Sequence, residues 1–387
     1  MNMPFSIHPW IWSVGWITSL LLLISSIPER TLSAESAPGF MVATPGKQLV
    51  FPSDHGSHPD FRIEWWYITG HLRTKQEARR LGYQATFFRI AQQMAQTPSK
   101  PDSKTSQWYL AHMALLDLNE KRFIHQERLH RPPMASAAIQ DMDLRHGNWS
   151  LKRHEDSVGE HFELVGSVLA EALFKLTLRP TKPLTLFGDK GYSRKGSQEQ
   201  AASYYMTYTR LETEGSLQLG DKVWQVSGQS WMDHEVSSSQ LGKNQVGWDW
   251  ISIRFNDGYD VMAYRMRTLD GEADPASTLA WVDPEGQLSQ QPLSDAMWQP
   301  LEYWKSPDTG ITYPIKIALN LPLPHSPERG HFRVIPLYSA QEMKGRISGI
   351  TYWEGACEVL NADNQVVGEA YMELAGYDGR KLTDTLN

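Results

Sequence analysis

The fold class is decided by residues 248–266, which read WDWISIRFNDGYDVMAYRM. Polar and apolar side chains alternate on both sides of the tripeptide Asn-Asp-Gly at 256–258. Alternation with period two places successive side chains on opposite faces of a β-strand, and Asn-Asp-Gly tolerates the positive φ values of a tight turn. The stretch therefore predicts a β-hairpin whose strands are 248–255 and 259–266.

The same alternation extends over the rest of the chain. Residues 174–179 (FKLTLR) and 311–317 (ITYPIKI) alternate, and turn signals recur at 283–286 (DPEG) and 361–364 (NADN). Helical periodicity is scarce, and residues 135–143 offer a single short candidate. Many short strands separated by turns are typical of antiparallel sheets that close into barrels or stack as sandwiches. We predict an all-β protein.

Length and an internal echo predict two domains. The chain has 387 residues and is longer than the chains that a single hydrophobic core usually supports. The motif EWWY at 64–67 is echoed by GWDW at 247–250, and each precedes a glycine-marked hairpin. Since the stretch between the two halves is rich in Ser, Gly and Asn, we place an N-terminal domain at 45–236 and a C-terminal domain at 237–380.

The N-terminal segment predicts export. Residues 11–27 (IWSVGWITSLLLLISSI) contain no charged side chain and are followed by small residues around Ala34. This order is typical of a signal peptide cleaved after Ala34. Because roughly 17–25 apolar residues span a bilayer, an uncleaved anchor is the alternative. We expect residues 1–34 to direct the protein to the periplasm or the extracellular space, with membrane association if they stay attached.

Composition excludes several classes of partner and site. The chain has 37 Lys and Arg against 44 Asp and Glu, a net charge of −7 without a basic block, so we expect no nucleic-acid partner. A single cysteine, Cys357, excludes an intramolecular disulfide, a thiolate zinc cluster and an iron–sulfur centre. Gly-x-Ser-x-Gly, His-Glu-x-x-His and the glycine-rich nucleotide signatures are absent from the sequence. We expect neither a cofactor nor a metal.

Several motifs, taken in order, resemble a known family. They are IEWWYITGHL at 63–72, YYMTYTRL at 204–211, SWMDHE at 230–235 and GWDW at 247–250. Together they resemble the AttH-like/hydroxyneurosporene synthase (carotenoid 1,2-hydratase) family, over about residues 50–377. The resemblance implies two tandem lipocalin-like antiparallel β-barrel domains. For hydratase members it also implies cofactor-free addition of water to a terminal isoprenoid double bond.

The densest polar triplet is Asp233-His234-Glu235. In a strand, Asp233 and Glu235 share one face and His234 points to the other. Two carboxyls on the inner face of a barrel disfavour each other's ionisation, so one stays protonated near neutral pH and serves as a general acid. The alternatives are a surface strand end or a hydrogen-bonded cluster between domains. One histidine beside two carboxylates lacks the spacing of a defined metal site.

Aromatic residues surround the second candidate position. Trp248 and Trp250 share one strand face and Asp249 takes the other, while Tyr264 is a cross-strand neighbour in the predicted hairpin. In the reaction that the resemblance implies, protonation of an alkene gives a carbocation, which aromatic faces stabilise by cation–π attraction. We therefore expect these four residues to bind the ligand. The alternative is that the indoles fill a barrel core.

The first long strand offers further ligand-binding candidates. Glu64 and Trp66 share one face, and Trp65 and Tyr67 share the other. Either Glu64 and Trp66 contact the ligand or, as in the barrels that the resemblance implies, a tryptophan of this strand plugs one end. Arg89 and Arg210 are candidate partners for Glu64. The preceding loop carries His55 and His58 between two aspartates, for which we favour an exposed turn over a divalent-ion site.

These observations combine into one functional hypothesis and its alternatives. We predict an exported protein that binds an apolar, isoprenoid-like small molecule and acts on it by cofactor-free acid catalysis, as a hydratase or isomerase. Asp233 and Glu235 would transfer protons. The alternative is a non-catalytic lipid carrier or scaffold of the cell envelope. A third alternative places the site between the domains rather than inside a barrel.

Overall fold

The computed structural model describes residues 39–77, 79–92, 106–198, 200–239, 241–242 and 244–379. The predicted signal peptide or anchor lies outside these residues. Within them, no helix is long and apolar enough to cross a bilayer. All of the described residues belong to one compact unit of the chain.

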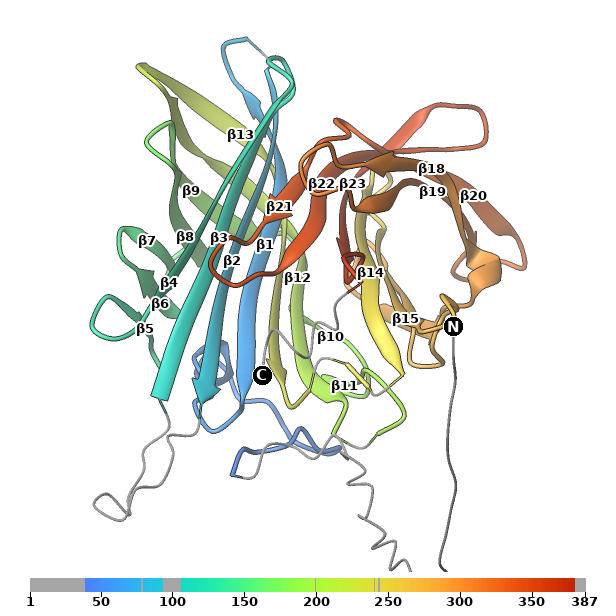
Figure 1. The fold of residues 1–387 in the computed structure, drawn as a ribbon, viewed down its shortest axis with the longest axis horizontal. Helices are drawn as coiled ribbons and strands as arrows, with labels where there is room; N and C mark the ends of the chain where they lie inside the picture. The colour runs from blue at the N-terminus through green and yellow to red at the C-terminus, as the bar shows by residue number, and fades with distance from the viewer. Residues whose placement is uncertain are drawn as a thin grey trace, which may run out of the picture. The chain divides into compact units, whose positions relative to one another are not determined.

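The protein is almost entirely β-structure, as predicted (Figure 1). The helices of the described chain are two single turns of 3-10 type, η1 (Ser53–His55) and η2 (Asp295–Met297). The strands form two antiparallel sheets. Residues 135–143, the short helical candidate, instead contain strand β5 (Ala135–Ala137) and the first residue of β6 (Asp143–His146).

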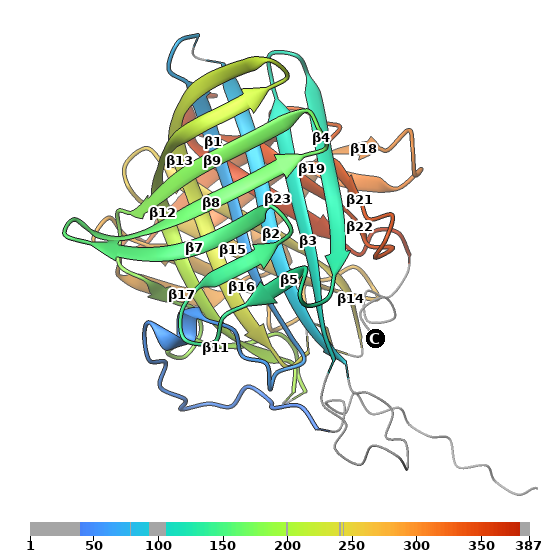
Figure 2. The ribbon, with the colours of Figure 1, turned by 90° about the vertical axis from the view of Figure 1, so that its left-hand side faces the viewer.

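The first sheet has thirteen strands in the order β4-β3-β2-β1-β13-β12-β9-β8-β7-β6-β5, with β10 and β11 also paired to β12. Figure 2 shows β9, β8 and β7 following one another across this sheet. Its strands are β1 (Ile63–Thr74), β2 (Arg80–Gln92), β3 (Ser106–Asp117), β4 (Arg122–His130), β5, β6, β7 (Trp149–Asp156), β8 (Gly159–Val168), β9 (Ala172–Pro180), β10 (Thr185–Leu186), β11 (Tyr192–Arg194), β12 (Ala202–Leu219) and β13 (Lys222–Ser237).

The second sheet has ten strands in the order β17-β16-β15-β14-β23-β22-β20-β19-β18, with β21 also paired to β22. Its strands are β14 (Gln245–Phe255), β15 (Asp260–Thr268), β16 (Thr278–Val282), β17 (Leu288–Pro292), β18 (Trp298–Lys305), β19 (Thr312–Pro322), β20 (Arg329–Pro336), β21 (Glu342–Lys344), β22 (Thr351–Leu360) and β23 (Val366–Ala375). The predicted hairpin is confirmed, since β14 and β15 pair across a turn in which Gly258 has a φ of +94°.

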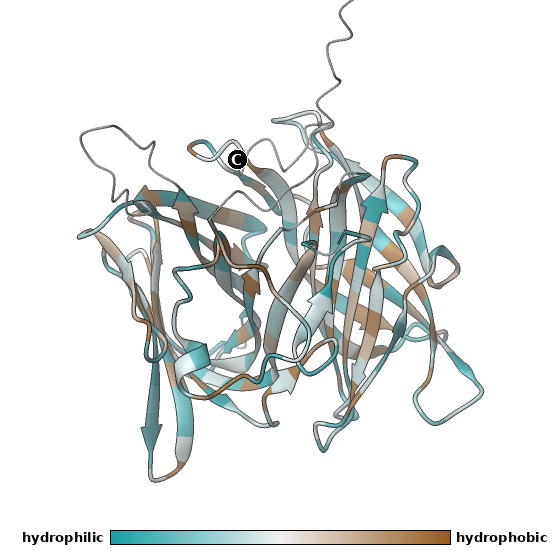
Figure 3. Cartoon of the chain, turned by 90° about the horizontal axis from the view of Figure 1, so that it is seen from below, coloured by the Kyte–Doolittle hydropathy of each residue, from teal (hydrophilic) through white to brown (hydrophobic). Residues whose placement is uncertain are grey.

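Each sheet curls around an apolar core of its own, and a third apolar cluster lies between the sheets. Hydropathy alternates along the strands, as Figure 3 shows. In β1 this alternation turns Trp66 and Ile68 into the core of the first sheet and turns Tyr67 toward the second sheet. Several strands are therefore buried on both faces, which places polar side chains of β1 and β13 between the two sheets.

Candidate functional site

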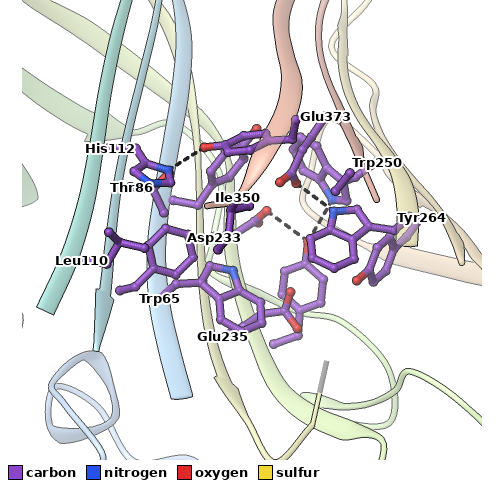
Figure 4. A pocket seen from close by; sticks show the side chains of 16 residues that line it. Trp65, Thr86, Leu110, His112, Asp233, Glu235, Trp250, Tyr264, Ile350 and Glu373 are labelled. Carbon is purple, nitrogen blue, oxygen red and sulfur yellow. Dashed lines mark hydrogen bonds between the residues drawn. The ribbon is translucent and has the colours of Figure 1, made fainter. Parts of the chain in front are cut away.

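An aromatic pocket lies between the two sheets (Figure 4). Its cavity measures about 70 Å³. Both sheets contribute, so the carboxyls lie between the two sheets and not, as expected, on the inner face of a barrel. The lining residues are Trp65, Tyr67, Thr86, Phe88, Leu110, His112, Tyr205, Asp233 and Glu235 from the first sheet and Trp248, Trp250, Tyr264, Ile350, Tyr352, Glu373 and Ala375 from the second part of the chain.

Asp233 and Glu235 reach the pocket because β13 alternates. Met232 belongs to the core inside the first sheet, so its neighbour Asp233 faces the second sheet. Strand β13 is held on both sides, by β1 and by β12, and Asp233 lies opposite Tyr67 in one register and Thr207 in the other. The predicted sharing of one face by Asp233 and Glu235 is confirmed.

Asp233 is buried and accepts three hydrogen bonds. Its Oδ1 accepts from Thr207 Oγ1 and Trp231 Nε1, both at 2.7 Å, and its Oδ2 accepts from Tyr205 OH at 3.0 Å. Burial raises the pKa of Asp233 to about 7, with a contribution from the charge of Glu235, although the three donors favour the ionised form. This carboxyl therefore titrates near neutral pH.

Glu235 forms an ion pair that the sequence did not predict. Lys195 Nζ lies 2.7 Å from Glu235 Oε2, which also accepts a hydrogen bond from Ser203 Oγ at 2.5 Å. Lys195 is 2% exposed. Its Nζ lies over the rings of Tyr205 and Tyr264, at 4.4 and 4.5 Å from the two ring centroids. Burial lowers the Lys195 pKa while Glu235 opposes that shift.

A further carboxyl, Glu373 of β23, was missed by sequence reasoning. It lines the pocket, pairs with Trp250 in the β14–β23 ladder, and accepts a hydrogen bond at Oε2 from Trp248 Nε1 at 3.1 Å. Burial raises the Glu373 pKa to about 7, and the charge of Glu235 adds to the rise. The signal in the sequence was a lone glutamate inside the apolar run AYMELA at 370–375.

Two more polar contacts cross between the sheets beside the pocket. Tyr67 OH donates to Glu354 Oε1 at 2.6 Å, and burial raises the Glu354 pKa well above its usual value. On the other side, His112 Nδ1 lies 2.7 Å from Tyr352 OH. These two contacts thus hold the pocket wall from the first sheet against the pocket wall from the second.

The aromatic lining follows the predicted hairpin. Trp250 and Tyr264 are cross-strand partners, as predicted, and the ring of Tyr67 meets Trp250 edge-on with centroids 5.3 Å apart. Trp250 Nε1 donates to Tyr205 OH at 3.1 Å, so it extends the hydrogen-bonded chain that ends on Asp233. Trp248, Trp250 and Tyr264 all line the cavity.

Four of the predicted site residues lie on the opposite strand faces and do not line this pocket. Asp249 accepts hydrogen bonds from Arg265 and Arg267 of the neighbouring strand β15. The other three, Glu64, Trp66 and His234, lie together on the core side of the first sheet. The reason is period-two alternation, which turns each of them away from its neighbour in the pocket.

Glu64, Trp66 and His234 form a second buried group. Trp66 stacks on His234, with centroids 4.5 Å apart, and Arg89 Nε lies 3.5 Å from Glu64 Oε1, so Arg89 is the partner of Glu64. Among the described residues, the one group of His, Cys, Asp and Glu side chains with metal-ligand proximity is His58, Glu64 and His234. The preceding loop is not an exposed turn, because the His55 side chain packs on the barrel and is 4% exposed.

Two curled antiparallel sheets with an aromatic, carboxyl-bearing pocket between them define a lipocalin-like all-β protein. The sequence profile of the family described as AttH-like matches residues 42–377. The chain belongs to the AttH-like family, which confirms the resemblance found in the sequence.

Three solved structures are similar to this chain. A candidate AttH protein from Nitrosomonas europaea is 32% identical, with a TM-score of 0.75 over 87% of this chain and 100% of that one. Kievitone hydratase from Nectria haematococca is 14% identical, with a TM-score of 0.64 over 88% and 98%. CghA with Sch210972 is 11% identical, with a TM-score of 0.50 over 82% and 90%. The last two support the fold alone, and no curated protein matches the sequence.

Proposed function

We propose that this protein is a cofactor-free hydratase or isomerase that acts by acid catalysis on a carbon–carbon double bond of an apolar small molecule. The observation that carries the proposal is a pair of carboxyls, Asp233 and Glu373, that titrate near neutral pH in an aromatic pocket. A pair with pKa values near the working pH supplies one acid and one base at the same time.

The hydrogen bonds assign the two roles. Glu373 receives one donor, from Trp248, whereas Asp233 receives three, which favour its ionised form. Glu373 therefore donates its proton to one alkene carbon, and the positive charge develops on the other carbon. Water adds to that carbon, and Asp233 takes the proton that the water releases. Proton exchange with solvent restores both carboxyls, so the net reaction is addition of one water molecule.

The remaining pocket residues stabilise the carbocation and set the electrostatic environment of the two reacting carboxyls. The rings of Trp250, Tyr264 and Tyr67 face the cavity, and aromatic faces attract a carbocation. Glu235 keeps its pairing with Lys195 and so acts as a fixed charge that raises the pKa of both carboxyls, rather than as a proton donor.

The size of the cavity narrows the substrate class. Pockets for drug-sized ligands measure roughly 300–1,000 Å³, whereas this cavity measures about 70 Å³. It holds the reacting end of a molecule, such as a branched terminal alkene of a few carbons, while the rest of the molecule extends out of the pocket. An acyclic isoprenoid fits that description. The fold itself accommodates a hydratase, since kievitone hydratase shares it.

The test is turnover in heavy-oxygen water. Purified protein is incubated with a panel of acyclic terpenoids, and products are analysed for incorporated label by mass spectrometry. We expect one labelled oxygen per product molecule, with at least a hundredfold loss of rate in Glu373→Gln and Asp233→Asn and no loss in the exposed control Glu328→Gln. Equal rates in all four proteins would contradict the assignment, as would the absence of label across the panel.

A non-catalytic lipid carrier is the second candidate. The observation in its favour is the completeness of the hydrogen bonding around Asp233, which is also what a structural carboxyl would have. A carrier binds the same terpenoids without changing them. Native mass spectrometry of protein from its own organism would then show a co-purifying apolar molecule that survives incubation unchanged.

Export is proposed on the sequence of residues 11–27 alone. Amino-terminal sequencing of the protein isolated from its organism would show a start at residue 35 for a cleaved signal peptide. A start at residue 1 in a membrane fraction would show the anchored form.

A further inference from the structure

We propose that His58, Glu64 and His234 bind a divalent first-row transition metal ion, with Zn²⁺ as the best-fitting one. The site lies on the face of β13 opposite to the aromatic pocket and is separate from the chemistry proposed there. Two imidazoles and one carboxylate form a ligand set that suits zinc and its neighbours in the first row.

Three separate segments bring the ligands together. Glu64 lies at the start of β1, His234 lies on the neighbouring strand β13, and His58 comes from the loop that follows η1. In the β1–β13 ladder Trp66 pairs with His234, so Glu64 and His234 are on the same face and two residues apart in register. One potential ligand atom from each of the three residues lies within 4.8 Å of the others.

His234 is the observation that points to a ligand. Its side chain is 3% exposed, and neither ring nitrogen has a hydrogen-bond partner among the described residues. A neutral imidazole carries one donor and one acceptor, and leaving both buried without partners costs stability. A metal ion bound to one of these nitrogens compensates this cost.

One distance between ligand atoms matches that of a tetrahedral site. Zinc binds nitrogen and oxygen at about 2.0–2.2 Å, so two ligand atoms at the tetrahedral angle lie about 3.3–3.5 Å apart. His58 Nδ1 and Glu64 Oε2 are 3.4 Å apart. The other carboxylate oxygen, Oε1, lies 3.5 Å from Arg89 Nε, so one oxygen faces the proposed ion and the other keeps its pairing with Arg89.

The surroundings of His58 resemble those of a metal ligand. Its Nε2 lies 2.8 Å from Asp54 Oδ1, and a carboxylate on the distal nitrogen orients a metal-binding histidine and increases its basicity. Asp54 is itself fixed by the backbone N–H of Val50 at 2.5 Å and by Lys47 Nζ at 3.3 Å. The carboxylates of Glu64 and Asp54 can balance the charge of a divalent ion. Arg89 and Lys47, which pair with these carboxylates, reduce that negative charge.

Such an ion would tie the loop at residues 56–62 to the first sheet. The loop already packs there, because Trp66 Nε1 donates to His55 O at 3.2 Å and the backbone N–H of His58 donates to Glu64 Oε2 at 2.8 Å. Binding to the folded state alone raises stability with the concentration of the ion. The site is therefore structural, and its removal affects the thermal midpoint before it affects turnover.

The experiment is zinc titration of the chelator-treated full-length protein. We expect one Zn²⁺ per chain by calorimetry and elemental analysis, a thermal midpoint that rises by several degrees on addition of zinc, and, with Co²⁺, the strong visible bands of a tetrahedral site. His58→Gln and His234→Gln are each expected to weaken binding at least tenfold. The control is His154→Gln, which removes a partly exposed histidine stacked on His161 and is expected to change nothing.

Several outcomes would overturn the proposal. These are no uptake of Zn²⁺ at micromolar concentration, or uptake that is lost in His154→Gln and retained in His58→Gln. Should His234→Gln not fold, His58→Gln decides the matter, because His58 lies in a loop and is partly exposed. Every readout is metal content, spectrum or thermal midpoint, so failure here leaves the proposed hydratase activity untouched.

Discussion

At the scale of single residues, burial and partners give three carboxyls of one pocket different properties. Neither Asp233 nor Glu373 forms an ion pair with a described residue, and burial raises their pKa values to about 7. Glu235 has Lys195 at 2.7 Å. The same side-chain chemistry thus gives two carboxyls whose pKa values are raised by burial and one that is held in an ion pair.

The raised pKa of Glu373 predicts a pH-dependent effect of Glu373→Gln on stability. In the unfolded chain this carboxyl ionises near its ordinary value of 4.5, and in the folded protein near 7. Between these values the folded state holds a proton that the unfolded state has lost, so wild-type stability falls as pH rises. Since Gln does not ionise, we expect the variant to gain about 3 kcal/mol relative to wild type between pH 4.5 and pH 8.

Urea denaturation of both proteins at four pH values checks this prediction. The control is Glu328→Gln, whose stability difference from wild type should stay constant with pH. A difference for Glu373→Gln that does not change with pH would show that the carboxyl ionises normally.

The Lys195–Glu235 pair gives a second prediction at this scale. Lys195→Met leaves the Glu235 charge buried without its partner, which costs about 3–5 kcal/mol. The double variant Lys195→Met/Glu235→Gln removes both charges and should recover most of that loss. Thermal or urea unfolding of the two single variants and the double variant forms the cycle. Additive losses would mean that the two residues act independently.

At the scale of elements, β13 shows how much the sequence could predict. Alternation correctly assigned Asp233 and Glu235 to one face and His234 to the other. It did not show which face meets which core, because residues 230–237 are buried on both faces, and Asp233 and Glu235 are as inaccessible as the apolar residues of the other face. The inside of a barrel and the space between two sheets therefore looked the same from sequence.

The same limit explains the residues that sequence reasoning missed. Glu373 and Lys195 lie 138 and 40 residues from Glu235 along the chain. Glu373 of β23 comes close because the second sheet packs on the first, and Lys195 comes close because it follows β11, which pairs with β12 beside β13. A period-two pattern fixes faces within a strand and says nothing about which strands become neighbours. The hairpin of β14 and β15 was predictable because its two strands are joined by their own turn.

The contact between β2 and β22 predicts the effect of a single methyl group. A Cβ atom at Gly82 would lie 2.6 Å from the Cβ of Ala356, so the two sheets approach too closely there for a side chain. Gly82→Ala should lower stability by about 1–3 kcal/mol through overpacking. The double variant Gly82→Ala/Ala356→Gly moves the methyl group to the other strand and should regain at least half of the loss. No recovery in thermal unfolding would place the strain elsewhere.

At the scale of the whole molecule, charged contacts join the two sheets that form the pocket. Asp260 of β15 is fully buried and accepts from Arg210 of β12 at 2.6 Å, and Lys182 Nζ lies 2.7 Å from it. Tyr67 and Glu354 make a second connection across the sheets. These contacts connect the two walls of the pocket.

Removal of the Asp260 charge should therefore weaken the whole assembly. Asp260→Asn leaves two cations without their shared counter-ion, which costs about 3–5 kcal/mol. We also expect weaker binding of apolar ligands, measured by quenching of Trp fluorescence, because the pocket walls separate more easily. The exposed control Asp270→Asn should change neither. Unchanged stability in Asp260→Asn would show that the sheets are held by apolar packing alone.

The proposed mechanism depends on two pocket carboxyls whose pKa values lie near 7, so that one can be protonated while the other is ionised. Infrared difference spectroscopy measures this directly, through the carbonyl band of protonated carboxyls between pH 5 and pH 9, with Glu373→Gln and Asp233→Asn to assign the bands. We predict bands that disappear around pH 7 and that shift to lower pH in Glu235→Gln, because the Glu235 charge raises both pKa values. Fully ionised Asp233 and Glu373 already at pH 5 would contradict this prediction.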